Sequence, residues 1–369
     1  MKNKLALVIF TYFPYGGLQR DFYNVAIELK KKDLELTIFC SAWVGDFPED
    51  IEVRTIKSFG LTNHKKNQNF YKHFMKEVLH YQPDLIFGFN KMPNLDLYFA
   101  GDTCYLNSSK QKSFLYKLSP RYKQFTFFEQ EVFSLGKTPK ILLLNEKQKN
   151  IFKKEYGTDD ARLIIVPPGL PETWLDGKET LDLKNELGLR ESTSIILFVG
   201  SDFARKGLDR AIYSLFSLRN KDVDSYLIVA GEDDFKPYAK LAEELGIGNR
   251  VKYIGPRKDI RRLMLNSDIL IHPAIEEAAG NVIVEAMCSC LPVLVSASVG
   301  YASLVIENKA GLVTNNPFDQ SDLDRSLFEL LSRNTNISFR NSLKKLTKKN
   351  FFHTRYSFIA ELVEQSLNA

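Results

Sequence analysis

The chain has 369 residues, 44% of them hydrophobic and 26% charged, which is a globular composition at a length that suggests about two domains. Four cysteines are too few for a disulfide framework, Cys288 and Cys290 lack a second pair at zinc-ligand spacing, and no apolar stretch reaches the ~18–20 residues that span a bilayer. The net charge of +5 is unevenly divided, because residues 1–168 have 25 Lys and Arg against 18 Asp and Glu, whereas residues 169–369 have 25 against 27.

The first half of the chain alternates short apolar runs, typical of strands buried on both faces, with helical stretches. A glycine turn follows the first run, and a helix is predicted over Leu18–Lys32. The double proline Pro167-Pro168 continues neither a strand nor a helix, so we place the boundary there between a domain of residues 1–168 and one of residues 169–350. The strands predicted in this half are Leu5–Phe10, Leu36–Cys40, Leu85–Phe89, Ile141–Leu144 and Leu163–Val166.

A second alternating series begins at Ser194, and its last predicted strand closes the run at Ser296. Strands separated by helices of this length imply parallel sheets with right-handed crossovers. The sequence therefore predicts an α/β protein of two tandem doubly wound domains, with ligands at the carboxyl ends of the strands in an interdomain cleft. Residues 351–369 form a final segment, with a helix over Phe351–Leu367 that we expect to pack back on the first domain. The strands predicted in this series are Ile195–Gly200, Tyr226–Ala230, Val251–Ile254, Ile269–His272 and Pro292–Ser296, and the helices are Gly207–Leu218, Pro237–Leu245, Asp259–Asn266 and Asn281–Ser289.

Two loops between a predicted strand and helix have the composition of an anion site. Gly16 and Gly17 let the backbone approach a ligand closely at a helix N-terminus, which favours an anion, although a tight turn explains the same pair. Arg205 and Lys206 occupy the corresponding place in the second domain, at a predicted helix start where cations oppose the helix dipole. Charge-assisted hydrogen bonds from these cations would hold a diphosphate, and a solvated loop is the alternative.

The segment Ile271–Ala286 carries two carboxylates eight residues apart, Glu277 before a predicted helix and Glu285 on its first turns. Gly280 frees the backbone N–H groups at the helix start for a sugar or phosphate oxygen. Glu285 can accept hydrogen bonds from a vicinal diol, as carboxylates do with ribose. Because Glu285 lies among apolar residues, its carboxylate needs a partner.

Together these features resemble the retaining GT-B glycosyltransferases, which have two Rossmann-like domains and use nucleotide-diphosphate sugars without a metal. The matching motifs are the Gly16-Gly17 loop, Arg205-Lys206-Gly207 and Glu277-x7-Glu285. Over nearly the whole chain the likeness narrows to the lipopolysaccharide core glucosyltransferase I group, which transfers glucose from UDP-glucose to an inner-core heptose. The segments that carry this narrower resemblance are Tyr12–Phe22, Val44–Asp46, Thr62–His64, Gly88–Pro93 and Gly200–Phe203.

The resemblance implies that one set of residues binds the nucleotide sugar. Glu285 would bind the ribose hydroxyls of UDP, and Glu277 would face the donor sugar. The two adjacent cations would neutralise the diphosphate, the glycine pair would present backbone N–H groups near the donor phosphates, and the loop ending in Arg257 would lie along the uracil. The donor-binding residues that it implies are Gly16, Gly17, Arg205, Lys206, Arg257, Glu277, Ala279, Gly280, Asn281 and Glu285.

The resemblance also implies a catalytic set of Asp102, Lys206 and Glu277. Asp102 matches an aspartate next to the reacting centre, where the wider superfamily often has a histidine, and Ala279 stands where that superfamily usually has a phenylalanine. Retaining transfer without an obvious carboxylate nucleophile implies a same-face substitution, in which the leaving phosphate accepts the acceptor's proton. The enzyme then positions the substrates and stabilises the departing diphosphate, and we expect no metal or other cofactor.

Other function classes find less support in the sequence. A metal-dependent GT-A enzyme needs an Asp-x-Asp motif after a strand, but Asp222–Asp224 precedes one and Asp322–Asp324 looks helical. A nicotinamide oxidoreductase needs a spaced glycine fingerprint, which neither half contains. A GT-B transferase with another nucleotide sugar or glycan acceptor stays open, as does a non-catalytic carbohydrate-binding protein.

Residues 103–128 contain no acidic residue and interleave cations with aromatic and apolar side chains, which either pack in the core or lie on the surface. No nucleic-acid reader motif accompanies them, so we expect no nucleic-acid partner. An anionic membrane surface fits a lipid-linked acceptor, and five cations near it contribute up to about 5 kcal/mol of attachment that salt weakens. We therefore expect a cytoplasmic protein, peripheral on the inner membrane, that docks through Lys110, Lys112, Lys117, Arg121 and Lys123.

Overall fold

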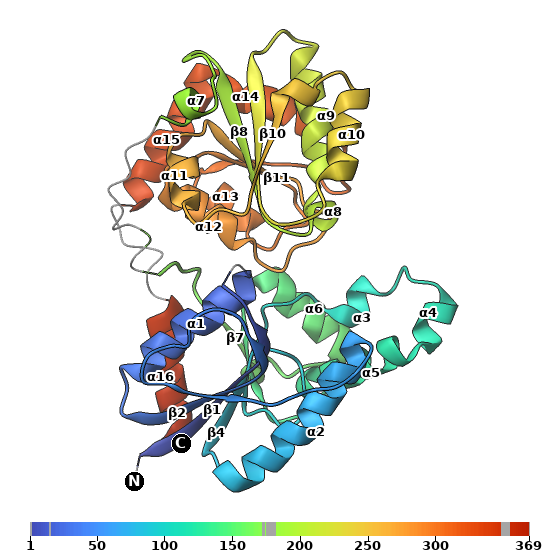
Figure 1. Cartoon of the computed structure of the whole chain (residues 1–369), viewed down its shortest axis with the longest axis vertical. Helices are drawn as coiled ribbons and strands as arrows, with labels where there is room; N and C mark the ends of the chain where they lie inside the picture. The colour runs from blue at the N-terminus through green and yellow to red at the C-terminus, as the bar shows by residue number, and fades with distance from the viewer. Residues whose placement is uncertain (1, 15, 172–173, 175–181, 348–354, 369) are drawn as a thin grey trace. The chain divides into compact units, whose positions relative to one another are not determined.

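The computed structural model shows two units, each built on one parallel sheet (Figure 1). Unit 1 comprises residues 1–167 and 354–369, and unit 2 comprises residues 168–353. Over the described residues, the first sheet has seven strands and the second has six, which confirms the α/β architecture of two doubly wound domains. The structure describes residues 2–14, 16–171, 174, 182–347 and 355–368.

Unit 1 has the strand order β3-β2-β1-β4-β5-β6-β7. The strand β1 (Asn3–Tyr12) pairs in parallel with β2 (Leu34–Trp43) on one side and with β4 (Leu85–Gly88) on the other. Residues 5–9 of β1 are buried, as expected of a strand with helices on both faces of its sheet. The remaining elements are β3 (Glu52–Thr55), β5 (Leu97–Phe99), β6 (Lys140–Leu143), β7 (Leu163–Ile165), α1 (Gly17–Lys30), α2 (Asn63–Tyr81), α3 (Tyr105–Ser108), α4 (Phe114–Leu118), α5 (Pro120–Phe133), α6 (Glu146–Tyr156) and α16 (Arg355–Leu367).

Unit 2 has the strand order β10-β9-β8-β11-β12-β13. Its core gathers the apolar faces of β8, β9 and β11 with those of α9 and α14. The adjacent strands β8 and β11 run in parallel, so the loops after them leave the sheet at the same edge. The elements are β8 (Ser194–Val199), β9 (Ser225–Ala230), β10 (Val251–Gly255), β11 (Ile269–His272), β12 (Val293–Val295), β13 (Gly311–Val313), α7 (Leu183–Glu186), α8 (Phe203–Lys206), α9 (Leu208–Arg219), α10 (Lys236–Glu244), α11 (Ile260–Leu265), α12 (Asn281–Cys288), α13 (Ala302–Glu307), α14 (Gln320–Leu331) and α15 (Arg333–Thr347).

The expectation that the strands end at Ser296 is wrong, because β13 pairs with β12 from Gly311 opposite Val293. The strands β3 and β5 were not predicted either. All three are short, since β5 and β13 have three residues each and β3 has four. Moreover, β3 is an edge strand whose Glu52 is exposed and whose Arg54 is half-buried, so it lacks the continuous apolar run of a central strand.

The helix α16 packs on α1 in unit 1. Arg355 is fully buried there, and its Nη1 donates to Oδ1 of Asp21 at 3.0 Å. The hydroxyl of Tyr356 donates to the same oxygen at 2.9 Å, and Nε of Arg355 donates to the Pro167 carbonyl at 3.0 Å. One carboxylate of α1 thus binds the start of α16 at the place where the chain leaves unit 1. Residues 351–354 of the predicted helix lie outside the described residues.

Candidate functional site

In unit 2, the loops that follow β8 and β11 bring two cations and a carboxylate together. Nζ of Lys206 and Nη1 of Arg205 lie 2.8 and 2.9 Å from the same oxygen, Oε2 of Glu277. Arg205 also donates from Nε to Asp202 at 2.7 Å and from Nη1 to the Glu276 carbonyl at 3.0 Å, which fixes its guanidinium. The side chains of Lys206 and Glu277 are 14% and 16% exposed. Lys206 and Glu277 are therefore largely desolvated, which strengthens their interaction with a charged ligand, whereas the side chain of Arg205 is 41% exposed.

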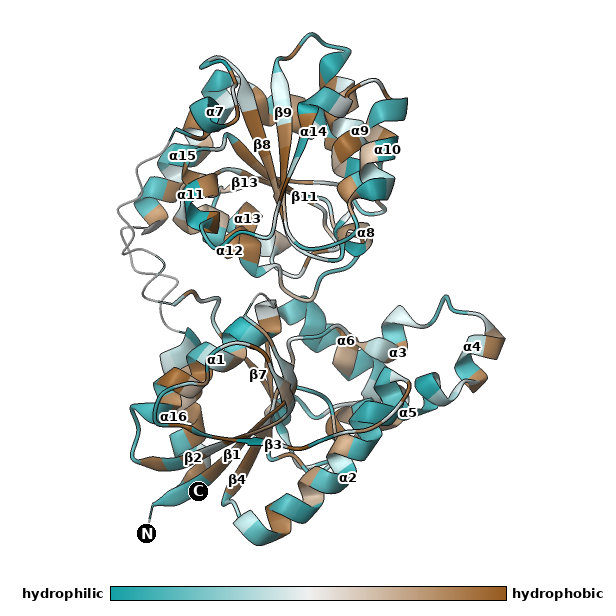
Figure 2. Cartoon of the chain, viewed as in Figure 1, coloured by the Kyte–Doolittle hydropathy of each residue, from teal (hydrophilic) through white to brown (hydrophobic). Residues whose placement is uncertain are grey.

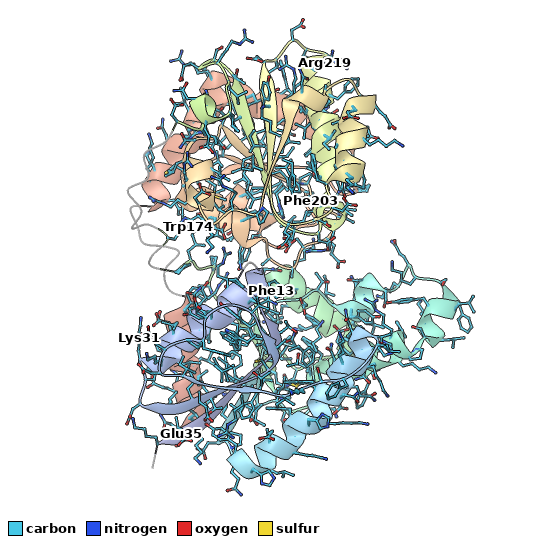
Figure 3. All side chains as sticks on the ribbon, in the orientation of Figure 1. Phe13, Lys31, Glu35, Trp174, Phe203 and Arg219 are labelled. Atoms are coloured by element: carbon cyan, nitrogen blue, oxygen red, sulfur yellow. The ribbon has the colours of Figure 1, made fainter. Side chains whose placement is uncertain are left out.

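The two cations directly precede the N-cap residue of α9, Gly207, as predicted, but they also belong to a short helix, α8, that the sequence did not indicate. They occupy the last turn of α8, which is anchored by the fully buried Phe203 (labelled in Figure 3). The following Gly207 has a left-handed φ of +74° and starts α9. A Cβ on Gly207 would lie 2.3 Å from the carbonyl oxygen of Pro273, so the corner between α8 and α9 packs directly on the β11–α12 loop.

Charge fixes the protonation states in this cluster. Burial by itself raises the pKa of the Glu277 carboxyl, but Lys206, His272 and Arg205 outweigh burial and lower that pKa to about 2. His272 ends β11 and is fully buried, and neither of its ring nitrogens has a hydrogen-bond partner among the described residues. Burial, together with Lys206, lowers the pKa of its imidazole to about 3. At neutral pH, Glu277 is therefore ionised and His272 is uncharged.

The remaining residues of the Glu277-x7-Glu285 motif surround the start of α12. Gly280 is the N-cap residue and has a left-handed φ of +90°, and a Cβ on it would lie 2.9 Å from Cγ1 of Val299. It offers no side chain as a cap, and backbone N–H groups at a helix start favour an anion. Ala279 and Glu285 are buried, and Asn281 is half-buried. The motif thus places Glu285 one turn into an apolar helix.

Arg257 is engaged elsewhere in unit 2. Its Nε and Nη2 donate to the two carboxylate oxygens of Asp259, each at 2.7 Å. These hydrogen bonds lower the pKa of Asp259 to about 2. Among the described residues, the ion pairs of Arg257 are with Asp259 and Glu186, so the structure does not join Arg257 to the cluster around Glu277.

In unit 1, the glycine loop and Asp102, which was predicted to be catalytic, come together. Gly16 precedes α1 as its N-cap residue, and a Cβ on Gly17 would meet no other described part of the chain within 4 Å. A Cβ on Gly101 would lie 2.4 Å from Cδ1 of Leu18, so the segment that carries Asp102 packs on the first turn of α1. The side chain of Asp102 is exposed. The carboxyl ends of β1 and β5 therefore offer an open backbone loop beside an exposed carboxylate.

The five predicted docking cations lie along the segment from α3 to α5, and α4 projects from the body of unit 1 (Figure 1). Lys112, Arg121 and Lys123 are exposed. Lys110 is exposed but forms an ion pair with Glu155. Lys117 is half-buried and donates to the Lys110 carbonyl at 3.2 Å.

The apolar side chains of α4 lie on the surface, which answers whether they pack in the core. Phe114, Leu115 and Leu118 are 73%, 78% and 51% exposed. Figure 2 shows apolar brown beside polar teal on α4. No helix within the described part of the chain is long and apolar enough to cross a membrane. Across those same residues, no three His, Cys, Asp or Glu side chains gather closely enough to hold a metal ion.

A family model, a sequence relative and a solved structure all point to the same family. Residues 179–350 match the model of the family Glycosyl transferases group 1. The chain is 37% identical over 337 residues to the lipopolysaccharide glucosyltransferase WaaG of Escherichia coli K12, covering 89% of this chain and 90% of the relative. The crystal structure of WaaG, a glycosyltransferase involved in lipopolysaccharide biosynthesis, matches with a TM-score of 0.91 and 33% identity over 97% of this chain and 99% of that one.

A more distant structure shares the fold alone. Anabaena HepE, solved in complex with UDP-glucose, matches with a TM-score of 0.75 and 17% identity over 99% of each chain. The similarity to WaaG, in contrast, extends over nearly the full length of both proteins at a substantial identity. The chain therefore belongs to the WaaG family of group 1 glycosyltransferases and has the GT-B fold.

Proposed function

We propose that this glycosyltransferase moves glucose from UDP-glucose to an inner-core heptose of lipopolysaccharide, with retention at the sugar and without a metal. The name of the E. coli relative supports a lipopolysaccharide acceptor and glucose as the transferred sugar. The UDP-glucose in HepE supports a uridine-diphosphate donor for this fold. The observation that carries the proposal is the cluster of Arg205, Lys206 and Glu277 beside the start of α12.

The donor site of the proposal is in unit 2. Glu285 binds the ribose hydroxyls, and the β-phosphate lies near the two cations. As the bond between the sugar and the phosphate breaks, negative charge grows on the phosphate oxygens. Arg205 and Lys206 are already held in place by Glu277, so they stabilise that charge without a large rearrangement. These side chains supply the positive charge that a divalent metal supplies in other transferases.

The acceptor site of the proposal is in unit 1. The exposed carboxylate of Asp102 accepts a hydrogen bond from the incoming saccharide, and the Gly16-Gly17 loop at the start of α1 offers backbone N–H groups to an anionic group of a substrate. The acceptor hydroxyl attacks from the face that the phosphate leaves, and the phosphate oxygen takes its proton. The chain contributes orientation and charge, which are the main catalytic terms in such a displacement.

The test offers a panel of nucleotide sugars with a truncated lipopolysaccharide acceptor and identifies the product by mass and linkage. We expect glucose transfer from UDP-glucose. A product formed from another nucleotide sugar would identify that sugar as the donor instead of UDP-glucose. Binding of a nucleotide sugar without any product would favour a carbohydrate-binding protein. Lys206→Ala removes a charged hydrogen bond of about 1.5–3 kcal/mol, so transfer falls roughly 10–100-fold. Lys240→Ala, which changes an exposed lysine on α10, is the matched control. Full turnover of Lys206→Ala at unchanged donor affinity would remove the role of Lys206.

The proposal places the enzyme on the cytoplasmic face of the inner membrane through the segment of residues 103–128. Exposed cations at roughly 1 kcal/mol each act together with the apolar surface of α4. We expect sedimentation with vesicles of phosphatidylglycerol and phosphatidylcholine at low salt, and release as salt rises. Binding that is absent, or that salt leaves unchanged, would contradict this attachment. A variant with the five cations changed to glutamine should stay in the supernatant.

A further inference from the structure

Asp102 has an exposed carboxylate on a backbone that buried side chains hold in place. Nε2 of Gln148 donates to the carbonyl of Ala100 at 3.1 Å and to that of Asp102 at 2.8 Å. Gln148 is itself buried in α6, where its backbone N–H donates to the side chain of Asn145 at 2.9 Å. The amide therefore binds the chain on both sides of Gly101 and leaves the carboxylate of Asp102 in solvent.

A second pair of side chains holds the backbone that follows Asp102. Nζ of Lys91 donates to the Thr103 carbonyl at 2.8 Å and to Oε1 of Glu129 at 2.6 Å. The carboxylate of Glu129 in turn accepts the backbone N–H groups of Tyr105 at 2.8 Å and Leu106 at 2.9 Å. With Gln148, these two side chains bind backbone groups of Ala100, Asp102, Thr103, Tyr105 and Leu106.

The group that binds these backbone N–H groups, the carboxylate of Glu129, is charged and fully buried, which is unusual for a residue with a purely structural role. It lies in α5 and is fully buried, and the hydroxyl of Tyr156 donates to it at 2.5 Å. Burial raises the pKa of Glu129, but the charge and hydrogen bond of Lys91 and the hydroxyl of Tyr156 lower it further, so the group stays ionised. Replacing a buried ion pair by apolar residues is often neutral or stabilising. The Lys91–Glu129 pair is therefore not explained by stability, and it indicates that the backbone it binds must keep one particular geometry.

We propose that Lys91, Glu129 and Gln148 are positioning residues, which hold the backbone of Asp102 so that its carboxylate meets the acceptor saccharide in a fixed orientation. The inference rests on the proposed function, in which Asp102 contacts the acceptor. It also gives a role to the segment Gly88–Pro93, which includes Lys91 and to which the proposed chemistry assigns none. A preorganised carboxylate costs little reorganisation when the acceptor binds.

The test is a double-mutant cycle with Asp102→Ala. We expect Lys91→Met and Gln148→Met each to lower kcat for transfer about tenfold or more, while the KM for UDP-glucose changes less than twofold. In the Asp102→Ala background, the same substitutions should lower kcat less than about threefold, because they act through a carboxylate that is no longer there. Lys91→Met leaves the buried Glu129 without its cation, so Gln148→Met, which removes no charge, decides the question if Lys91→Met does not fold.

A matched control separates positioning from stability. Thr158→Val removes a buried hydrogen bond of 2.6 Å to the Phe133 carbonyl, which lies in the same unit but outside residues 100–106, and should leave kcat unchanged. If Gln148→Met or Lys91→Met lowers kcat by the same factor in the Asp102→Ala background as in the wild type, the positioning role is overturned while the proposed function stays intact. Full activity of Asp102→Ala would overturn both this inference and the role of Asp102. A wild-type protein that binds UDP-glucose but transfers nothing would overturn the proposed function itself.

Discussion

Replacing Glu277 by glutamine tests the charge balance of the donor cluster. The surrounding cations lower the pKa of this carboxyl from 4.5 to about 2, and each pKa unit corresponds to about 1.4 kcal/mol. Because the pKa is lower in the folded state, the ionised carboxylate stabilises unit 2 by about 3 kcal/mol at pH 7. That contribution is fully present above pH about 4.5 and is lost as the pH falls toward 2. Glu277→Gln should therefore cost about 3 kcal/mol at pH 7 and about 1 kcal/mol at pH 3.

Urea unfolding followed by tryptophan fluorescence measures this difference in unit 2 alone. The chain has two tryptophans, Trp43 in unit 1 and Trp174 in unit 2. In a Trp43→Phe background, the signal comes from unit 2. Glu244→Gln is the control, since Glu244 forms an exposed pair with Lys240 that is worth less than about 1 kcal/mol. A cost of Glu277→Gln that equals this control, or that is the same at pH 3 as at pH 7, would refute the reasoning.

Three further substitutions test other features. Asp21→Asn breaks the buried pair with Arg355 and should destabilise unit 1 by about 3 kcal/mol in urea, read from Trp43 fluorescence in a Trp174→Phe background. Gly207→Ala forces a Cβ against the Pro273 carbonyl, so calorimetry should show the melting temperature of unit 2 falling by roughly 5 °C. Phe114→Ser removes an exposed ring from α4 and should weaken binding to phosphatidylglycerol vesicles about tenfold in a sedimentation assay, while leaving the melting temperature unchanged.

The fold was predictable for strands that are buried on both faces of the sheet, because such strands need a continuous run of apolar residues. Leu5–Phe10 predicted the central strand, and the structure extends it to Asn3–Tyr12 because the sheet pairs polar ends that carry no apolar signal. The short strand Gly311–Val313 gives no such run, and its place beside β12 comes from tertiary pairing. The edge strand Glu52–Thr55 keeps charged side chains, so it resembles a loop in sequence.

The site was predictable where topology alone brings residues together. Arg205 and Glu277 follow adjacent parallel strands, so their loops meet at one edge of the sheet. The ion pair between them was not predictable, because spacing along the chain gives no distance between side chains. The hydrogen bonds that hold the backbone around Asp102 were not predictable for the same reason. Gln148 donates to the Asp102 carbonyl from 46 residues further along the chain, and Glu129 accepts from the Tyr105 N–H from 24 residues further along.

The return of α16 to unit 1 has a consequence for the order in which the chain folds during synthesis. The carboxylate of Asp21 meets Arg355 only after 334 further residues have been made. By then the ribosome has already released the residues of unit 2, so the second unit can complete its core first. Unit 1 therefore completes its packing after the residues of unit 2 have been made. The helix α16 can pack on α1 only at that late stage. A nascent chain that stalls before Arg355 would expose the incompletely packed core of unit 1 to chaperones and proteases.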